Sequence, residues 1–362
     1  MAAALGPDEL AAIVNLAEFE APGKARMRGP AWDYVAGGSW DEVTLAENDA
    51  AWLDWRFVPR VLTDIRSVDV SGSFLGRRSA LPIAIAPMAV MAMAHPDAEG
   101  AVARAAAEAG MPYCVSTSAS TSIEGVAAAA PGADLLFQLY LSRDLEYTRS
   151  LVNRAVAAGY RAIVLTVDLP VLGYRERDRR SGFALPSMPN VEPAAGAARG
   201  RYAGLEDQRA IGLTWADIEA IRAWSPLPLV LKGIVAPDDA RRAVEHGVDG
   251  ICVSNHGARQ LDRTIATAHA LPAIVEAVAG RLEVWVDGGI RRGLDVAIAL
   301  ALGATGVLVG RPIYWALAAG GQAGVERAIA ILREELELTL PLLGCASVGD
   351  VNSALIRRSL GV

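Results

Sequence analysis

A short apolar run, a turn and an Ala-rich amphipathic stretch recur in this order along the chain from residue 81 onward. Each apolar run is too short for a helix and is bounded by Gly, Pro or a polar residue, which is typical of a buried parallel strand. Several amphipathic stretches end at a glycine, which often terminates a helix. The eight apolar runs cover residues 81–87, 111–117, 135–140, 162–168, 227–233, 250–255, 283–289 and 306–311. Helical patterns between them include residues 97–109, 143–158, 237–246 and 292–302.

Eight strand–helix units in a row predict an α/β fold of the closed (β/α)8 TIM-barrel type. The rival is an open, doubly wound sheet, but the chain contains no G-x-G and therefore no dinucleotide-binding fingerprint. We expect a single domain over residues 1–362, with the barrel at 81–320 and C-terminal helices at 321–362. Residues 1–80 are predicted to form an N-terminal helical extension and a cap on the barrel bottom, with short strands within 61–76.

One connection is much longer than the others. Residues 169–213 follow the fourth predicted strand, contain several prolines and a run rich in Ala and Gly, and show no periodicity. Connections of this length in compact domains are commonly lids or binding loops. Because this one follows the C-terminal end of a strand, it is predicted to be a mobile lid over the barrel mouth.

Composition excludes several classes of partner and site. The net charge of −7 argues against binding to a nucleic-acid backbone. The longest apolar stretches, residues 81–94 and 296–310, are shorter than the ~18–20 residues that a membrane span needs, so no membrane partner is expected. Three widely spaced cysteines without a C-x-x-C pair suit a reducing cytoplasm. The four histidines also lie apart in sequence, so no metal site is predicted.

Polar side chains stand where the predicted strands end, which is where barrels of this kind carry their active sites. His256 is a candidate base, and two arginines close to these ends could bind an anionic group, so the pattern indicates proton abstraction from a carboxylate-bearing substrate. The alternatives are that His256 is a hydrogen-bonded turn residue and that Arg175 belongs to a solvated charged loop. The candidates for chemistry are Tyr140, Asp168, Arg175, Lys232, His256 and Arg259.

Glycines and arginines follow the seventh and eighth predicted strands, at residues 287–293 and 310–312. Barrels commonly bind a phosphate at this place, on backbone N–H groups and the start of the following helix. The alternative is a tight turn that simply requires glycine.

The segment at residues 254–262, Ser-Asn-His-Gly-Ala-Arg-Gln-Leu-Asp, resembles the signature of the FMN-dependent 2-hydroxy acid oxidases and dehydrogenases. Other motifs agree with this family in order, and the resemblance covers nearly the whole chain. They are Asp33-Tyr34, Pro59-Arg60, Ile85-Ala86-Pro87, Ala94-His95-Pro96, Phe137-Gln138-Leu139-Tyr140, Thr166-Val167-Asp168, Leu231-Lys232-Gly233, Asp287-Gly288-Gly289 and Gly310-Arg311-Pro312.

This resemblance implies an enzyme that uses FMN to oxidise an (S)-2-hydroxy acid to the 2-keto acid while O2 is reduced to H2O2. It implies that His256 is the base, that Asp168 stabilises the imidazolium, and that Arg175 and Arg259 bind the substrate carboxylate. The other implied positions are Tyr34 beside the carboxylate, Tyr140 near the hydroxyl, and Lys232 at the flavin N1 edge. The implied FMN contacts are Pro87, Met88, Ala89, Ser116, Gln138, Thr166, Lys232 and Ser254 and, for the ribityl-phosphate, Asp287, Gly289, Arg291, Gly310 and Arg311.

The substrate prediction depends on Ser118. In plant glycolate oxidases of this family the matching place holds a Trp, so Ser118 leaves space of about a phenyl ring, which Met88 and Met91 could line. We therefore expect mandelate or 4-hydroxymandelate as substrate. The alternatives are that Ser118 only turns the loop while Leu172 or the lid fills the space, that lactate or another aliphatic acid is the substrate, or that a quinone replaces O2. The resemblance to this family also implies that the protein forms a homotetramer.

Overall fold

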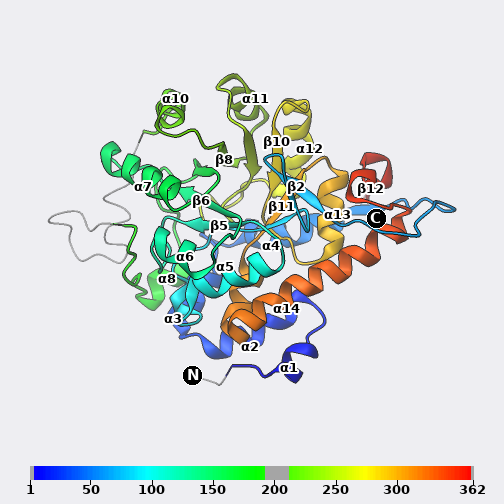
Figure 1. Ribbon diagram of the computed structural model, residues 1–362, viewed down its shortest axis with the longest axis horizontal. Coiled ribbons are helices and arrows are strands. Elements are labelled where there is room, and N and C mark those ends of the chain that lie inside the picture. Colours follow the sequence, from blue (N-terminus) through cyan, green and yellow to red (C-terminus); the bar gives the residue numbers. More distant parts are fainter. Residues whose placement is uncertain (1–3, 192–211, 360–362) are drawn as a thin grey trace.

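The computed structural model describes residues 4–191 and 212–359, and its centre is a closed barrel of parallel strands (Figure 1). The strands pair in chain order, and the barrel closes where Val307 and Val309 of the last strand pair with Ile83 and Ile85 of the first. The predicted TIM-barrel fold is thereby confirmed. The barrel strands are β4 (Ile83–Ile85), β5 (Tyr113–Ser116), β6 (Leu135–Leu139), β7 (Ile163–Thr166), β8 (Leu229–Ile234), β9 (Gly250–Val253), β10 (Glu283–Val286) and β11 (Gly306–Val309).

Seven of the eight predicted apolar runs contain the whole strand that they predict and extend one to three residues beyond its end, whereas the run at 227–233 stops one residue before the end of β8. Those extra residues leave the sheet and turn into the loops at the barrel mouth. Helices follow the strands and surround the barrel, with bounds within two residues of the four predicted patterns. They are α5 (Ala98–Glu108), α6 (Ile123–Ala129), α7 (Leu145–Ala157), α10 (Trp215–Trp224), α11 (Pro237–Glu245), α12 (Thr267–Val278), α13 (Gly293–Ala301) and α14 (Arg311–Leu343).

The barrel interior is filled by side chains and is not a pore. Alternate strand residues point inward, because successive side chains of a strand face opposite sides of the sheet. They form a cluster separate from the larger layer between strands and helices. Its members are Phe74, Ala84, Ala86, Cys114, Leu136, Ala162, Val164, Val230, Cys252, Trp285 and Leu308.

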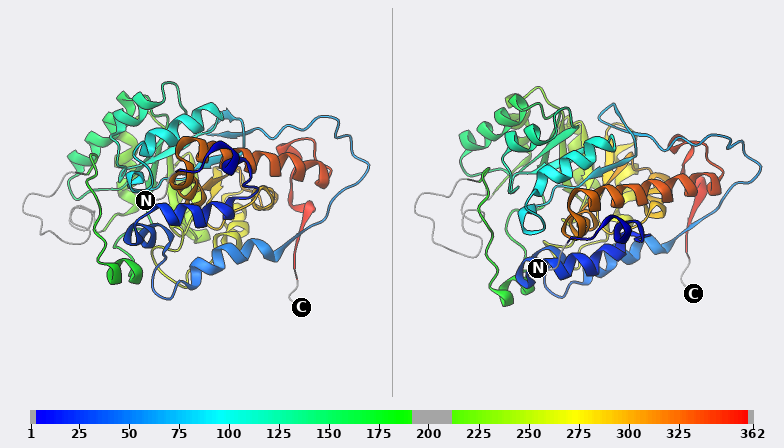
Figure 2. Two further views of the ribbon diagram at one scale, coloured as in Figure 1. Left: turned by 90° about the horizontal axis from the view of Figure 1, so that it is seen from below. Right: turned by 60° about the horizontal axis from the view of Figure 1, so that its bottom comes forward.

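The N-terminal extension is helical, as predicted, and lies along one side of the barrel. It contains α1 (Pro7–Ala11), α2 (Glu20–Arg26), α3 (Gly29–Ala36) and α4 (Val43–Ala50). Figure 2 shows α2 beside the long helix α14, and the two helices are in contact. The extension thus shares its apolar surface with the last helix of the barrel.

A short hairpin closes the bottom of the barrel. Strands β2 (Gly72–Phe74) and β3 (Arg77–Ser79) pair antiparallel and present Phe74 to the interior, where its ring meets Trp285 edge-on at 5.3 Å. Gly306 makes room for this ring, because a Cβ there would lie 2.7 Å from it. Of the short strands predicted within residues 61–76, the structure has β2 at Gly72–Phe74, whereas residues 61–71 contribute only an isolated bridge between Asp69 and Ser347.

The C-terminal segment differs from the prediction of helices alone. Helix α14 is broken at Gly320 and Gly321, and beyond its end at Leu343 the chain forms 3-10 turns and strand β12 (Ile356–Arg358). This strand pairs antiparallel with β1 (Trp55–Phe57). Strands of three residues are too short to show a hydrophobic period, so this pairing leaves no signal in the sequence.

The long connection after β7 is described in part. The short helix α8 (Glu176–Ser181), which no periodicity indicated, lies within it. The predicted mobile lid at 169–213 includes residues 192–211, which lie outside the described residues.

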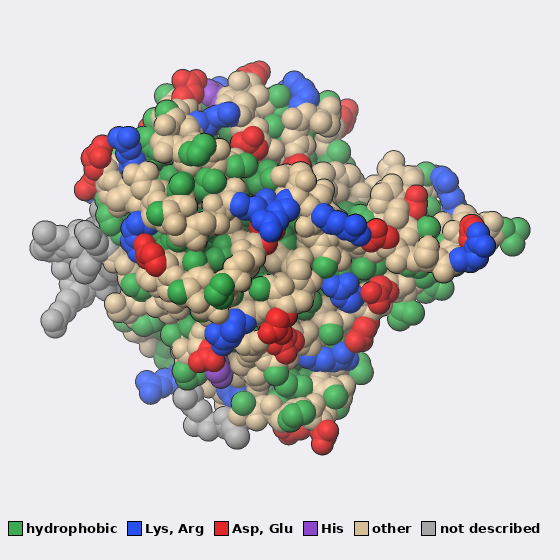
Figure 3. Space-filling view, viewed as in Figure 1, with side chains coloured by type: hydrophobic (Ala, Val, Ile, Leu, Met, Phe, Trp, Pro, Cys, Tyr) green, Lys and Arg blue, Asp and Glu red, His purple; other side chains and the backbone are tan. Residues whose placement is uncertain are grey.

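The described surface carries charged side chains of both signs. Acidic and basic side chains are interspersed over the face shown in Figure 3. Within residues 4–191 and 212–359, no helix is long and apolar enough to cross a bilayer.

Phe74→Ala tests the hairpin cap. Because this ring is fully buried in the barrel bottom, we expect its loss to lower the free energy of unfolding by about 3–5 kcal/mol. Urea denaturation at a fixed FMN concentration measures the change. The exposed control Val61→Ala should stay within ~0.5 kcal/mol of wild type, and an equal effect of both variants would contradict the role of Phe74.

Candidate active site

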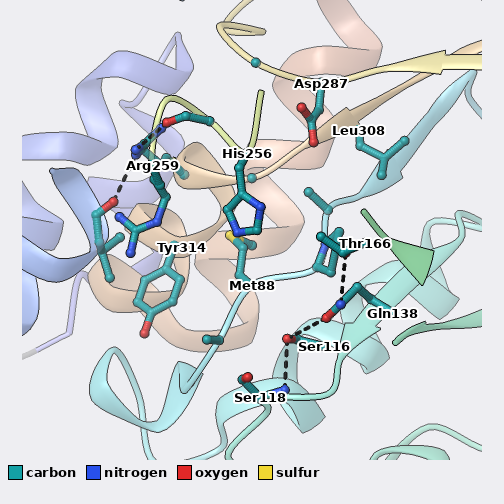
Figure 4. Close-up of a pocket in the computed structure, with 18 of the residues that line it drawn as sticks. Met88, Ser116, Ser118, Gln138, Thr166, His256, Arg259, Asp287, Leu308 and Tyr314 are labelled. Carbon is teal, nitrogen blue, oxygen red and sulfur yellow. Dashed lines mark hydrogen bonds between the residues drawn. The ribbon is translucent and has the colours of Figure 1, made fainter. Parts of the chain in front are cut away.

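A cavity opens at the C-terminal ends of the barrel strands, and all eight strands or their following loops contribute to its wall (Figure 4). Its empty space, including the part open to solvent, is about 1160 Å³. Three residues predicted at the site, Met91, Asp168 and Ser254, do not line this wall. Asp168 contacts His256, and Ser254 contacts Lys232. The predicted residues on the wall are Tyr34, Pro87, Met88, Ala89, Ser116, Ser118, Gln138, Tyr140, Thr166, Arg175, Lys232, His256, Arg259, Asp287, Gly289, Arg291, Gly310 and Arg311.

His256 is held by a carboxylate on one side and faces a phenol on the other. Its Nδ1 lies 2.8 Å from Oδ1 of Asp168, and its Nε2 lies 3.4 Å from the Tyr140 hydroxyl. Burial lowers the pKa of His256, and Asp168 offsets this effect only in part. Burial disfavours ionised Asp168, but His256 and Lys232, with a backbone hydrogen bond, together outweigh it, so the pKa of Asp168 lies below its ordinary value. A neutral imidazole backed by a carboxylate can accept a proton at Nε2.

An unusual backbone turn aims His256 into the cavity. His256, Gly257 and Ala258 have φ angles of 59°, 62° and 61°, in the left-handed region. The amides of Asn255 and Asn48 exchange two hydrogen bonds of 2.8 and 2.9 Å and tie this turn to α4. His256 is therefore fixed by the N-terminal extension as well as by the loop after its own strand.

Lys232 belongs to a buried ionic network. Its Nζ lies 2.7 Å from Oδ2 of Asp287 and donates to the Ser254 hydroxyl at 2.7 Å. Burial disfavours the charged lysine, but Asp287 and the other acidic groups nearby outweigh it, and the pKa of Lys232 lies above its ordinary value. The lysine thus presents a permanent positive charge to the cavity. The next residue, Gly233, has φ 115° and lacks a Cβ that would lie 2.6 Å from the Asp168 side chain.

Two guanidinium groups lie near the ring of Tyr34. Arg259 lies 4.7 Å and Arg175 6.0 Å from the ring centroid, measured from Cζ. Phe183 stacks on the same ring at 4.8 Å. Two cations at one end of a cavity favour an anionic group, and guanidinium geometry suits a carboxylate.

A chain of hydrogen bonds connects the cavity residues at the ends of β5, β6 and β7. Gln138 donates to Thr166 at 3.0 Å and accepts from the Ser116 hydroxyl at 3.1 Å, as Figure 4 shows. The Ser116 oxygen accepts from the backbone N–H of Ser118. The Ser118 hydroxyl is buried and has no hydrogen-bond partner among the described residues. Met91, predicted to line the same space, is instead fully buried behind the wall, where its sulfur accepts from Tyr113.

The loops after β10 and β11 form the remaining end of the cavity. Gly288 and Gly289 have φ angles of 95° and 76°, and a Cβ on Gly289 would lie 1.9 Å from the Asn48 carbonyl oxygen. Arg291 and Arg311 line the cavity beside them. Glycine backbone and two cations make this end suited to a phosphate.

Sequence reasoning missed two residues that hold the site together. Asn48 pairs with Asn255 from α4, and nothing in its surroundings in the sequence marks it. Gln260 donates to the carbonyls of Asp168 and Val171 and so fixes the loop that carries Arg175. Gln260 lies within the motif at residues 254–262, and this position could have identified it as a site residue. Leu185, also missed, lines the cavity from the connection after β7.

Within the described parts of the chain, no three His, Cys, Asp or Glu side chains group in a way that could hold a metal ion. The three cysteines are free and buried.

These features define a (β/α)8 barrel whose cavity holds a histidine–carboxylate pair, an end suited to a carboxylate and an end suited to a phosphate. Comparison with known proteins specifies the class. The family model of the FMN-dependent dehydrogenases matches residues 23–358. The chain therefore belongs to the FMN-dependent dehydrogenase family.

Individual relatives lie within the 2-hydroxy acid oxidase group. An L-lactate oxidase of Nostoc sp. is 46% identical over 358 residues, which cover 95% of this chain and 98% of the relative. Glycolate oxidase of Spinacia oleracea is 43% identical, with 95% of each chain covered. A solved structure of mandelate oxidase with (S)-4-hydroxymandelic acid has a TM-score of 0.89 at 46% identity, covering 94% of this chain and 97% of the other. The predicted FMN-dependent oxidase of this group, with FMN as its cofactor, is confirmed.

The residues present fit FMN. The phosphate-binding end provides Arg291, the glycine backbone and the start of α14, while Lys232 faces the centre of the cavity. Oδ1 of Asp287 is buried without a partner among the described residues, which leaves an acceptor for a hydroxyl such as those of the ribityl chain. Asp287 and Gln138 thus add polar partners between the two charged ends.

Gly289→Ala tests this fit. The added Cβ would collide with the Asn48 carbonyl, and the positive φ of Gly289 adds backbone strain, so the loop must move. We expect the FMN dissociation constant to rise at least about tenfold, measured by FMN fluorescence quenching.

Gly132→Ala is the matched control, because Gly132 also has a positive φ of 79° but meets nothing within 4 Å. Equal FMN affinities for the two variants would show that backbone strain alone, and not the contact with Asn48, accounts for the effect.

Proposed function

We propose that this enzyme oxidises an aryl (S)-2-hydroxy acid, (S)-mandelate or its 4-hydroxy relative, to the 2-keto acid while O2 is reduced to H2O2. One observation carries the proposal: the His256–Asp168 pair and the Arg175–Arg259 pair face the same cavity, next to a wall where residue 118 is small. This combination suits a substrate with a carboxylate, an adjacent hydroxyl-bearing carbon and a bulky apolar group.

His256 takes the proton from the hydroxy-acid centre, and Asp168 stabilises the imidazolium that forms. The lowered pKa of His256 supports this role because the imidazole is neutral, and able to accept a proton, at neutral pH. Tyr140 orients the substrate hydroxyl, supported by the 3.4 Å separation of its hydroxyl from Nε2 of His256. The imidazole of His256 and the phenol of Tyr140 would therefore both contact the hydroxyl-bearing carbon group of the substrate.

Arg175 and Arg259 hold the substrate carboxylate, with Tyr34 beside them. The two arginines are fixed relative to each other, because Nε of Arg175 donates to the Arg259 carbonyl at 3.2 Å. A clamp of this kind sets the distance between the carboxylate and the base, which places the reacting carbon under Nε2.

FMN, when bound, accepts the two electrons of the oxidation and passes them to O2. Lys232 would lie at the N1 edge of the flavin, where its charge favours the anionic reduced ring. Its high pKa supports this role, since the lysine keeps its charge despite burial. Pro87, Met88 and Ala89 would contact the ring from the loop after β4. The other ring contacts would be Ser116, Gln138, Thr166 and, behind Lys232, Ser254, with Asp287, Gly289, Arg291, Gly310 and Arg311 around the ribityl-phosphate.

The aryl preference rests on the wall beside the reacting carbon. Ser118 contributes a small side chain there, and the surrounding apolar side chains are Met88, Leu172 and Leu185. Thioether sulfur and leucine suit an aromatic ring. The mandelate oxidase structures support this choice, while the lactate and glycolate oxidases keep an aliphatic acid as the alternative.

The proposal includes a homotetramer in the cytoplasm. Three free, buried cysteines are consistent with a reducing compartment. Light scattering of the holoenzyme would measure the subunit count.

His256→Ala tests the base. We expect the variant to bind FMN normally but to reduce it at least ~10²–10⁴-fold more slowly in anaerobic stopped-flow experiments. In the wild type, the neutral imidazole is the active form, so the rate should fall only when the pH drops below the ordinary histidine pKa of ~6.5. His269→Ala, which removes a histidine paired with Asp54 away from the cavity wall, is the control. Near-normal reduction in His256→Ala would exclude this residue as the base.

Ser118→Trp tests the substrate. In the wild type we expect kcat/KM to be highest for (S)-mandelate, with H2O2 formed in air in equal amount to keto acid. The Trp side chain would fill the aryl space, so the variant should lose far more kcat/KM with mandelate than with glycolate or lactate.

Glycolate and lactate turnover serves as the internal control for this variant, because the same base and clamp would process them. A wild type that prefers lactate over mandelate would contradict the aryl pocket. Flavin reduction without H2O2 formation in air would favour a quinone or another carrier as the electron acceptor.

A further inference from the structure

Glu99 is a fully buried carboxylate that does not line the cavity. It lies in the first turn of α5. Its Oε1 accepts hydrogen bonds from the backbone N–H groups of Met91 at 3.1 Å and Ser120 at 2.8 Å, and its Oε2 accepts from the Thr121 hydroxyl at 2.9 Å. A buried carboxylate is unfavourable unless such bonds replace those it made with water. Glu99 and these three donors therefore keep one another in place.

The three donors belong to two different loops. Met91 lies in the loop between β4 and α5, whereas Ser120 and Thr121 lie in the loop between β5 and α6. A single oxygen of Glu99 accepts one N–H group from each loop. A second bond joins the same loops nearby, because the N–H group of Ala92 donates to the Ser120 hydroxyl at 3.0 Å. Glu99 thus links the loops after β4 and β5.

The same two loops carry the cavity wall to which the aryl group is assigned. Met88 of the first loop and Ser118 of the second both line the cavity (Figure 4). The loops also meet directly, where the N–H group of Val90 donates to the Ser118 carbonyl at 3.0 Å. A shift of one loop against the other would therefore change the space between Met88 and Ser118.

The loop after β4 contains a strained residue. Val90 has φ 49° and ψ 50°, in the left-handed region that a β-branched residue rarely adopts. Such a conformation persists only where the surrounding structure fixes it. The Val90 carbonyl accepts from the Tyr314 hydroxyl at 2.8 Å, and the next N–H group in the chain, that of Met91, is the one that Glu99 binds. Glu99 therefore supports the strained part of this loop.

We propose that Glu99 is a positioning residue for substrate selection, which sets the spacing of Met88 and Ser118 by holding the loops after β4 and β5 together. It acts through these loops, because it does not line the cavity itself. What matters is the length of its side chain and its ability to accept from both loops, not its charge. The proposal rests on the proposed function in assigning the aryl group to this wall.

Glu283 provides a matched control at the bottom of the barrel, where it is the first residue of β10. It accepts from the N–H groups of Leu75 at 2.8 Å and Gly76 at 3.2 Å and from the indole of Trp285 at 3.1 Å. Like Glu99, it therefore binds two backbone donors and one side-chain donor, and it does not line the cavity. Changes at Glu283 test the loss of such bonds at a distance from the aryl wall.

The experiment uses holoenzyme saturated with FMN and four variants, Glu99→Asp, Glu99→Gln, Glu283→Asp and Glu283→Gln. Selection of the aryl group is measured as the ratio of kcat/KM for (S)-mandelate to kcat/KM for L-lactate. Hydrogen exchange at residues 88–94 and 117–122 reports on the two loops. Urea denaturation gives the free energy of unfolding of each variant.

Aspartate keeps the charge but is one methylene shorter, so it cannot reach both loops. For Glu99→Asp we expect the mandelate-to-lactate ratio to fall at least about tenfold, mainly through a higher KM for mandelate, with faster exchange in both loops. Glutamine keeps the length, and its oxygen can accept from both N–H groups while its NH2 group donates to the Thr121 hydroxyl. Glu99→Gln should therefore stay within about threefold of the wild-type ratio.

Both Glu283 variants should keep the wild-type ratio and the wild-type exchange of the two loops, even where they lower the free energy of unfolding. The proposal is overturned if Glu99→Asp keeps the wild-type ratio, or if Glu283→Asp lowers the ratio as much as Glu99→Asp does. A loss in Glu99→Gln equal to that in Glu99→Asp would also overturn it, because the charge would then matter and not the hydrogen-bond geometry.

If Glu99→Asp does not fold, Thr121→Val decides, since it removes one bond to Glu99 at nearly unchanged volume. A smaller fall in the mandelate-to-lactate ratio supports the proposal, and the wild-type ratio overturns it.

A wild type that prefers lactate over mandelate would contradict the proposed function. Hydrogen exchange would still test the role of Glu99, because it does not depend on the substrate. Faster exchange in both loops of Glu99→Asp would support the link between them, and unchanged exchange would contradict it.

Discussion

A nine-residue segment after β9, residues 254–262, contacts three separate parts of the protein and fixes their relative positions. Its side chains reach the barrel interior, the N-terminal extension and the connection after β7. Because each contact has a partner far away in the sequence, His256 reaches its position only when all three parts are packed. These contacts are Ser254 with Lys232, Asn255 with Asn48, His256 with Asp168, Arg259 with the end of α3, Gln260 with the Asp168 and Val171 carbonyls, and Asp262 with the first N–H groups of α4.

The charge of the cavity is opposite to that of the whole chain. The protein carries a net charge of −7, yet the groups that line the cavity include four arginines and Lys232, with Asp287 as the one carboxylate among the described lining residues. Most of these cations interact with backbone carbonyls or with carboxylates of the protein. The positive charge is thus concentrated in the cavity, although the chain as a whole is acidic.

The barrel could be predicted from the sequence because each strand is apolar, short and followed by an amphipathic helix. The same logic found most of the cavity wall, since polar residues such as His256 and Lys232 stand where an apolar strand ends. It failed where a contact joins distant segments without a local pattern. Asn48 is an ordinary polar residue of a helix until Asn255 pairs with it, and no local pattern indicates that the Arg311 side chain donates to the Val35 carbonyl of α3. The hydrophobic periodicity of a sequence indicates which residues are buried. It does not indicate which distant segment a long polar side chain contacts.

The left-handed turn at His256 lowers the thermostability of the enzyme. A residue with a side chain at a φ near +60° costs free energy that glycine would avoid, and functional sites are where such strain is retained. A glycine at this position would relax the backbone and at the same time remove the imidazole. Selection for thermostability alone would therefore favour a glycine at this turn, and with it the loss of the imidazole. His256 has to be kept unchanged when the enzyme is stabilised by mutation.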